Sequence, residues 1–97
     1  MFVVSLTYLV ALSEVEIHLP AHITYLEAQY TAGHFLASGR KEPRTGGVIL
    51  ALVDSREVLE HILDFDPFKQ NGIAHYDVIE FMPTKTAPEL EFLRVSA

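Results

Sequence analysis

Cysteine is absent from this sequence, and positive charge is scarce. Without cysteine the chain has neither disulfide bonds nor a thiolate nucleophile, and this composition suits a reducing compartment, so we expect a cytoplasmic protein. Lysine and arginine number 7 against 13 aspartates and glutamates, which gives a formal net charge of −6. Because nucleic-acid binding requires a basic footprint, and no local basic cluster supplies one, we expect no nucleic-acid partner.

Long apolar runs and phosphate-binding glycine motifs are missing as well. The apolar start of the chain, Phe2 to Leu12, is much shorter than the roughly 20 residues that a membrane helix needs. It has no basic segment before it and no Ala-x-Ala cleavage site after it, so it predicts a strand and no membrane contact. Walker and dinucleotide-binding patterns are absent, and no organic cofactor is implied. The 97 residues, 49% of them hydrophobic, predict one folded domain.

The first part of the chain predicts a strand followed by a helix. Side chains alternate between two faces in Phe2–Tyr8, which is the pattern of a half-buried strand. A helix is predicted from about Pro20, which suits a first helical turn, to Gly33, and His18 then lies before it. Ser13 and the glutamate three residues later have the spacing of a capping box and predict an irregular turn at the start. The expected inner face of this helix comprises Leu19, Ile23, Leu26 and Tyr30.

The middle of the chain predicts a hairpin of two strands. His34–Gly39 and Val48–Val53 form the strands, and the turn-rich segment Lys41–Gly47 joins them. Val48–Val53 contains no polar residue, which is typical of a strand buried on both faces.

The last elements are a second helix and a fourth strand. Asp54 or Ser55 can cap the helix, and Pro67 forces Asp66 out of helical geometry, so the helix is expected to end there. Alternation in Ile73–Met82 predicts the fourth strand. The expected inner face of this helix comprises Val58, Leu59, Ile62 and Leu63.

The element order predicts an α+β fold. The order βαββαβ is the ferredoxin-like split βαβ, in which both helices cover one face of a four-stranded antiparallel sheet. That arrangement leaves the other face bare, although Val48–Val53 requires cover on both faces. A second copy packed sheet to sheet would supply the cover, so we expect a homodimer.

His22 and Asp66 are the candidates for acid–base chemistry, which needs at least a histidine and a carboxylate. His22 is expected near the helix start, at the margin of the apolar stripe, where a surface or hydrogen-bonded structural role would also account for it. Asp66 precedes a proline, and such an aspartate often only initiates a turn. His18 lies four residues before His22, but no third ligand has a characteristic spacing, so we expect no metal.

Arginine beside glycine in the hairpin turn suggests a second kind of site. Arg44, followed by Gly46 and Gly47, could present a charge and backbone N–H groups to an anion. A hairpin that simply needs glycine in its turn explains the same pattern.

Six short segments occur in a characteristic order: Pro20–His22, Tyr25–Leu26, Gly33–Gly39, Pro43–Gly47, Asp66–Phe68 and Tyr76–Pro83. Together they resemble the YCII-related family over about residues 1–85, which leaves residues 86–97 as a tail without a predicted place. The resemblance implies a ferredoxin-like dimeric α/β barrel with a His–Asp pair in a pocket of each protomer. His22 and Asp66 match that pair by motif position, and Ser38, Gly39 and Arg44 match segments at the pocket edge.

The family includes an enzyme that eliminates chloride from a chlorinated hydroxyhydroquinone. The resemblance therefore implies His22 as general acid or base and Asp66 as the group that fixes its tautomer, acting on a small aromatic or oxygenated substrate by elimination or isomerisation. Two alternatives stay open, namely a noncatalytic module that binds a small ligand in the same pocket and a structural dimeric accessory protein. An Arg44 side chain in the pocket would favour anion binding, and a pocket filled by side chains would favour the structural role.

Overall fold

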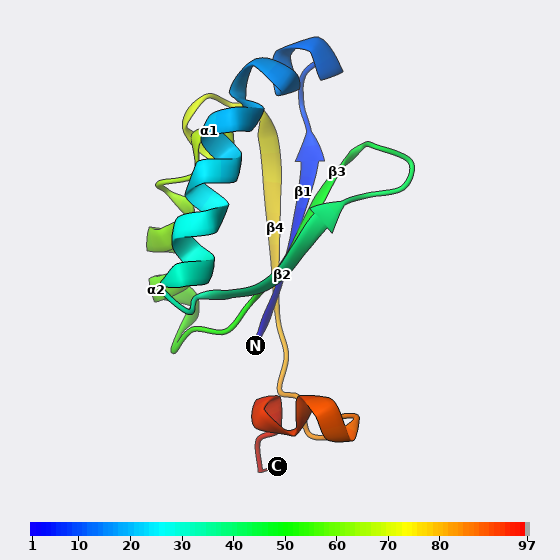
Figure 1. The fold of residues 1–97 in the computed structure, drawn as a ribbon, viewed down its shortest axis with the longest axis vertical. Helices are drawn as coiled ribbons and strands as arrows, with labels where there is room; N and C mark the ends of the chain where they lie inside the picture. Colours follow the sequence, from blue (N-terminus) through cyan, green and yellow to red (C-terminus); the bar gives the residue numbers. More distant parts are fainter. Residues whose placement is uncertain (97) are drawn as a thin grey trace.

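A computed structural model describes residues 1–96 and shows a four-stranded antiparallel sheet with helices on one side (Figure 1). This confirms the predicted α+β, ferredoxin-like βαββαβ fold. The elements are β1 (Phe2–Tyr8), α1 (Leu12–Thr31), β2 (Phe35–Arg40), β3 (Gly46–Ala51), α2 (Arg56–Leu63), α3 (Pro67–Gln70), β4 (Ala74–Glu80) and the 3-10 helix η1 (Pro88–Leu93).

The sheet has the order β2-β3-β1-β4, and its register defines two faces. Directly paired residues share a face, and side chains alternate along each strand. Val4 pairs with Ile49 and Val78, so these side chains lie on the face that the helices cover. The opposite side, here named the open face, carries Val3, Ser5, Val48, Leu50, Asp77 and Ile79.

The hydrophobic core lies between the sheet and the helices. Phe2, Val4 and Leu6 of β1 are buried there, and Val15 of α1 and Leu59 of α2 are fully buried against them. Burial of one such side chain stabilises the fold by about 1.5–3 kcal/mol, so the core holds α1 and α2 against the sheet. Among the described helices, none is long and apolar enough to cross a membrane.

Helix α1 begins eight residues before the predicted start. It starts at Leu12 and contains Pro20, so His18 lies inside the helix and Ser13 is not its cap. An internal proline costs about 3 kcal/mol. Burial of Val15, with Leu19 packed against the same core, is large enough to offset that cost. Figure 1 shows the first turns of α1 at an angle to the rest, as expected where proline removes a hydrogen bond.

The second predicted helix is α2, and an additional short helix that was not predicted follows it. Helix α2 is capped by Ser55, whose Oγ accepts a hydrogen bond from the Val58 N–H, and it ends at Leu63. The four-residue helix α3 follows after a turn and begins at Pro67. Val58 was expected in the core but is 44% exposed, and so is Ile23 of α1. Periodicity assigned these side chains to the inner faces, and the rotation of each helix on the sheet places them at the edge instead.

In the single chain the side chains of the third strand are buried on one face only, and cover of the other face by a second copy stays a prediction. In β3 the residues Gly46, Ile49 and Ala51 are buried, and Val48 and Leu50 on the open face are half-buried. Gly46 at the start of this strand cannot carry a side chain, since an added Cβ would lie 1.7 Å from the Leu6 carbonyl oxygen.

The C-terminal segment leaves the sheet after β4. Figure 1 shows it extending away from the helices and ending in η1. It is held locally, because the Val95 N–H donates to the Pro83 carbonyl at 3.0 Å and Leu93 is buried.

Candidate functional site

His22 lies on the buried side of α1, inside the helix rather than at its start. Only 8% of its surface is exposed, and the same helix also buries Val15 and Tyr25. The spacing from Val15 to His22 is seven residues, or two helical turns, so the sequence aims His22 into the core. A histidine in this position needs a hydrogen-bond partner, because an unpaired buried polar group costs about 1–3 kcal/mol.

Asp66 supplies that partner and is itself fully buried. It is the N-cap of α3, where its Oδ1 accepts a hydrogen bond from the Phe68 N–H at 3.0 Å, and Pro67 takes the first helical position. Aspartate followed by proline is a favourable start for a helix, since the cap satisfies a free N–H and proline has the required φ. The local sequence therefore fixes where this carboxylate points.

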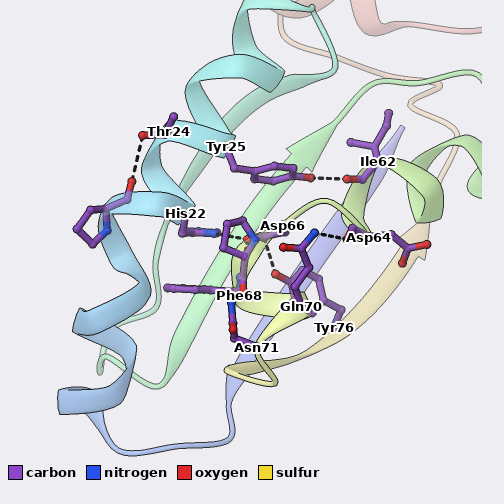
Figure 2. A network of polar contacts seen from close by, with 12 residues as sticks. His22, Thr24, Tyr25, Ile62, Asp64, Asp66, Phe68, Gln70, Asn71 and Tyr76 are labelled. Atoms are coloured by element: carbon purple, nitrogen blue, oxygen red, sulfur yellow. Dashed lines mark hydrogen bonds and ion pairs between the residues drawn. The ribbon is translucent and has the colours of Figure 1, made fainter.

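The two side chains meet between α1 and α3 (Figure 2). The distance from His22 Nδ1 to Asp66 Oδ1 is 2.7 Å, across 44 residues of sequence. The Tyr76 hydroxyl, from β4, donates a hydrogen bond to Asp66 Oδ2. Since both carboxylate oxygens accept from other donors, we assign the proton of this contact to Nδ1 of His22. The carboxylate is then satisfied by three hydrogen bonds inside the core.

Two tyrosines beside Asp66 are held in the protonated form. Burial, the Asp66 charge and the hydrogen bond to Asp66 together raise the pKa of Tyr76 far above its ordinary value. Burial, with the charges of Asp66 and Asp64, also raises the pKa of Tyr25, whose hydroxyl donates to the Ile62 carbonyl at 2.9 Å. Both phenols are therefore permanent donors at neutral pH, and Tyr76 stays a donor to Asp66.

The ring of His22 is fixed by stacking. It lies parallel to the Phe68 ring, with 3.8 Å between ring centroids and an interplanar angle of 1°. Phe68 follows Asp66 in α3, so one short helix supplies both the hydrogen bond to Nδ1 and the stacking surface. Because the hydrogen bond fixes Nδ1 and the stacking fixes the ring plane, Nε2 can point in only one direction.

That direction opens on a cavity between α1 and the sheet. The cavity has a volume of about 160 Å³ and is mainly apolar. In residues 1–96, every fully buried side-chain nitrogen or oxygen has a hydrogen-bond partner. The described hydrogen bonds of His22 engage only Nδ1, so Nε2 must reach accessible space. The lining residues are Leu6, Tyr8, Leu19, His22, Ile23, Leu26, Ser38, Gly39, Arg40, Gly47, Val48, Ile49 and Phe68.

The expected binding residues divide into two groups. Ser38 and Gly39 line the cavity with His22, and the Ser38 hydroxyl hydrogen-bonds that of Tyr30. Arg44 lies outside it, in a neighbouring hollow beside Pro20, where its Nη1 donates to Glu16 Oε1 at 3.2 Å. That hydrogen bond is the main reason why the pKa of Arg44 is raised.

Three site residues were not anticipated: Phe68, Tyr76 and Arg40. Phe68 stands in the Asp-Pro-Phe segment, in which only Asp66 was a candidate site residue. Tyr76 has the strand parity of the inner face, and that parity was the available signal. Arg40 was missed because the second strand was expected to end at Gly39, and it lines both the cavity and the neighbouring hollow.

Residues 1–96 contain no cluster of three or more histidine, aspartate or glutamate side chains that could hold a metal ion. His18 and His22 share α1 at a spacing of four residues, but the Nδ1 of His22 is engaged by Asp66.

Comparison with known proteins agrees with this architecture. Among solved structures the fold is similar to that of 5-chloro-2-hydroxyhydroquinone dehydrochlorinase (TftG) from Burkholderia phenoliruptrix AC1100, in complex with 2,5-dihydroxybenzoquinone. The TM-score is 0.70 at 19% sequence identity, over 82% of this chain and 91% of that chain. At this identity the likeness establishes the fold and leaves the reaction open. No curated protein sequence matches the chain significantly.

The fold and the buried pair thus define a ferredoxin-like α+β protein with a histidine–aspartate pair beside a small cavity. The sequence model of the YCII-related domain family matches residues 1–82. The chain belongs to that family.

Proposed function

We propose that this protein is a small-molecule enzyme that uses His22 and Asp66 for proton transfer, in an elimination or isomerisation. One observation carries the proposal: His22 is bound through Nδ1 to a buried carboxylate at 2.7 Å, and its other nitrogen faces an apolar cavity. A histidine with only a structural role would not need an open cavity on its second nitrogen. The open cavity therefore favours a functional pocket over a purely structural accessory protein.

The proposed chemistry uses each group once. Neutral His22 carries its proton on Nδ1, so the lone pair of Nε2 is free to take a proton from a substrate carbon or hydroxyl. The Asp66 carboxylate stabilises the imidazolium that forms and keeps its tautomer fixed. In an elimination the bond electrons left on the substrate expel the leaving group. In an isomerisation the imidazolium returns the proton to another substrate atom.

The cavity indicates the size of the substrate. A protein cavity of roughly 150 Å³ accommodates one benzene ring. The volume of about 160 Å³ here and the aromatic and aliphatic walls suit a single planar ring with few substituents. The dehydrochlorinase of similar fold is named for a one-ring substrate and was solved with a one-ring ligand, which supports the same class for this chain.

We also propose a homodimer formed through the open face. Val3, Leu50 and Ile79 lie there side by side across three strands, and no described element covers them. A second copy would bury this apolar surface by sheet-to-sheet packing. The cytoplasmic location and the division into a domain of residues 1–85 and a tail of residues 86–97 stay predictions.

Hydrogen–deuterium exchange tests the function without knowledge of the leaving group. A panel of one-ring hydroxylated and halogenated compounds is incubated with the protein in D₂O, and loss of substrate C–H signals is followed by NMR. We expect His22→Ala and Asp66→Asn each to slow exchange. The double variant should lose far less than the product of the two losses, because residues that act as a unit are non-additive. His75→Ala, a histidine of the open face, is the matched control.

The outcomes separate the candidate functions. Exchange that is unchanged by His22→Ala contradicts the proposal. Compounds that shift the His22 signals but never exchange a proton would favour the noncatalytic binding module.

A further inference from the structure

We propose that the ligand of this cavity carries an anionic oxygen, which Arg40 binds at the cavity mouth while the ring lies against Phe68 and His22. The ligand class is then a small, planar, one-ring acid. This inference rests on the proposed function, because it assigns the substrate class of the same pocket.

The strand register brings Arg40 to the cavity. Arg40 pairs with Gly47 across β2 and β3, and Gly47 pairs with Leu6 of β1. Paired residues share a face, so Arg40 lies on the helix-covered face at the edge of the sheet. Arg40, Gly47 and Leu6 all line the cavity with His22.

Arg40 is free to change partners, whereas Arg44 is not. The ion pair from Arg40 Nε to Glu42 Oε1 spans 3.1 Å, with the two side chains 67% and 75% exposed. Such a surface pair contributes about 0–1 kcal/mol, so a ligand can replace Glu42 at little cost. Arg44 is only 27% exposed and is held by Glu16. A guanidinium has five N–H donors in a planar fork, and the described pair of Arg40 uses one of them.

The charge distribution favours an anion at this place. The protein has a formal net charge of −6, yet the hairpin around the cavity mouth carries Arg40, Lys41 and Arg44 out of 7 lysines and arginines in all. The hollow that adjoins the cavity is lined by Arg40 and Arg44 together with Glu16, which is paired with Arg44, so the charge of Arg40 is the one that Glu16 leaves unbalanced there. Among the residues that line the cavity itself, Arg40 is the one lysine, arginine, aspartate or glutamate. A positive charge at the edge of an apolar cleft concentrates ligands of the opposite sign, so an acidic ligand would be drawn to this edge.

A pair of isosteric probes tests the inference. Benzoate and benzamide have the same ring and shape, and only benzoate is anionic. Binding is measured by NMR titration at the His22 ring signals of the full chain. Charge-assisted hydrogen bonds contribute about 1.5–3 kcal/mol, or roughly tenfold or more in affinity. We therefore expect benzoate to bind about tenfold more tightly than benzamide, and added salt to reduce the difference.

Variants identify the residue. Arg40→Gln should remove the preference for benzoate, and Arg40→Lys should retain part of it. Arg94→Gln, which removes the same charge from the C-terminal segment, should leave the preference unchanged.

Each other result overturns the inference. Equal binding of both probes at His22 would leave a functional pocket that does not select anions. A preference that survives in Arg40→Gln would exclude Arg40 as its source. If neither probe shifts His22, the inference fails, and the hydrogen–deuterium exchange experiment still decides the proposed function separately.

Discussion

Residues 1–96 contain two histidine–aspartate pairs that differ in almost every physical respect. His22 and Asp66 come from two helices 44 residues apart, meet at 2.7 Å and are buried. His75 and Asp77 are neighbours on one face of β4, lie 3.2 Å apart and have side chains 61% and 65% exposed. The first pair is also stacked, by Phe68, and hydrogen-bonded to a third group, Tyr76.

The difference shows why a contact between histidine and aspartate is not sufficient for function. In water the exposed pair is screened and gains about 0–1 kcal/mol. In the core the same atoms interact in a low-dielectric environment, and the surrounding donors hold both side chains in one geometry. Only the buried pair offers a ring nitrogen to a cavity, so only that pair has a position from which to act on a ligand.

Loss of the carboxylate should separate the two pairs most clearly. Asp66→Ala removes the partner of His22, the cap of the Phe68 N–H and the acceptor of Tyr76. Breaking a buried pair costs about 3–5 kcal/mol. We expect a loss of that size in urea denaturation, against at most about 1 kcal/mol for Asp77→Ala, since an exposed pair contributes little. Equal losses would contradict the contrast.

A charge on the open face tests the other side of the sheet. Leu50→Glu places a carboxylate at the proposed dimer interface, where a buried unpaired charge costs several kcal/mol. We expect sedimentation at micromolar concentration to show dimer for the unchanged chain and predominantly monomer for the variant, with reduced folding stability. Val58→Glu, on an exposed position of α2, is the control and should stay dimeric. Monomer alone in the unchanged chain would remove the proposed dimer.

Tyr76→Phe measures how much the hydrogen bond from Tyr76 to Asp66 contributes to stability. The variant keeps the ring but leaves Asp66 Oδ2 without its donor. A hydrogen bond to a charged group contributes about 1.5–3 kcal/mol, and we expect a stability loss in this range. Tyr30→Phe, whose hydroxyl is bonded only at the surface to Ser38, should lose less. If both variants lose the same, Tyr76 does not support Asp66.

Alkaline pH should lower the folding stability through Tyr76, the tyrosine bound to the buried pair. The pKa of Tyr76 in the folded protein is raised above its ordinary value of 10.0, mainly by burial. A raised pKa contributes stability that is complete below the unfolded-state value and is lost as pH rises toward the folded-state value. We expect the free energy of unfolding to fall above about pH 10, and to fall less steeply in Tyr76→Phe. Urea midpoints across this range measure the effect, and identical slopes would contradict it.

Local patterns in the sequence predicted much of the fold. Alternation predicted β1 with its observed bounds, whereas the Asp66-Pro67 step, interpreted as the end of the second helix, is the start of α3. The start of α1 was misplaced because the cost of Pro20 is local, whereas the burial of Val15 that offsets it is tertiary. Rotation of a helix on a sheet is also tertiary, and it moved Ile23 out of the core.

The site was harder to predict than the fold, because its parts lie far apart in the chain. Nothing local connects His22 with Asp66, and only the family resemblance brought them together. Tyr76 reaches Asp66 from another strand. Arg40 lies one residue beyond the predicted end of its strand and lines the cavity, whereas Arg44 in the hairpin turn does not.

The tautomer of His22 tests the central claim most directly. Two-bond ¹H–¹⁵N correlation spectra distinguish a protonated ring nitrogen from an unprotonated one. At a pH where histidine is neutral, we expect His22 to be protonated at Nδ1 and unprotonated at Nε2, because Nδ1 donates to Asp66, whereas the exposed His75 averages between tautomers. A one-ring ligand should then shift Nε2 of His22 and leave His75 unchanged. Neutral His22 protonated at Nε2, or averaged like His75, would contradict a carboxylate-fixed base that faces the cavity.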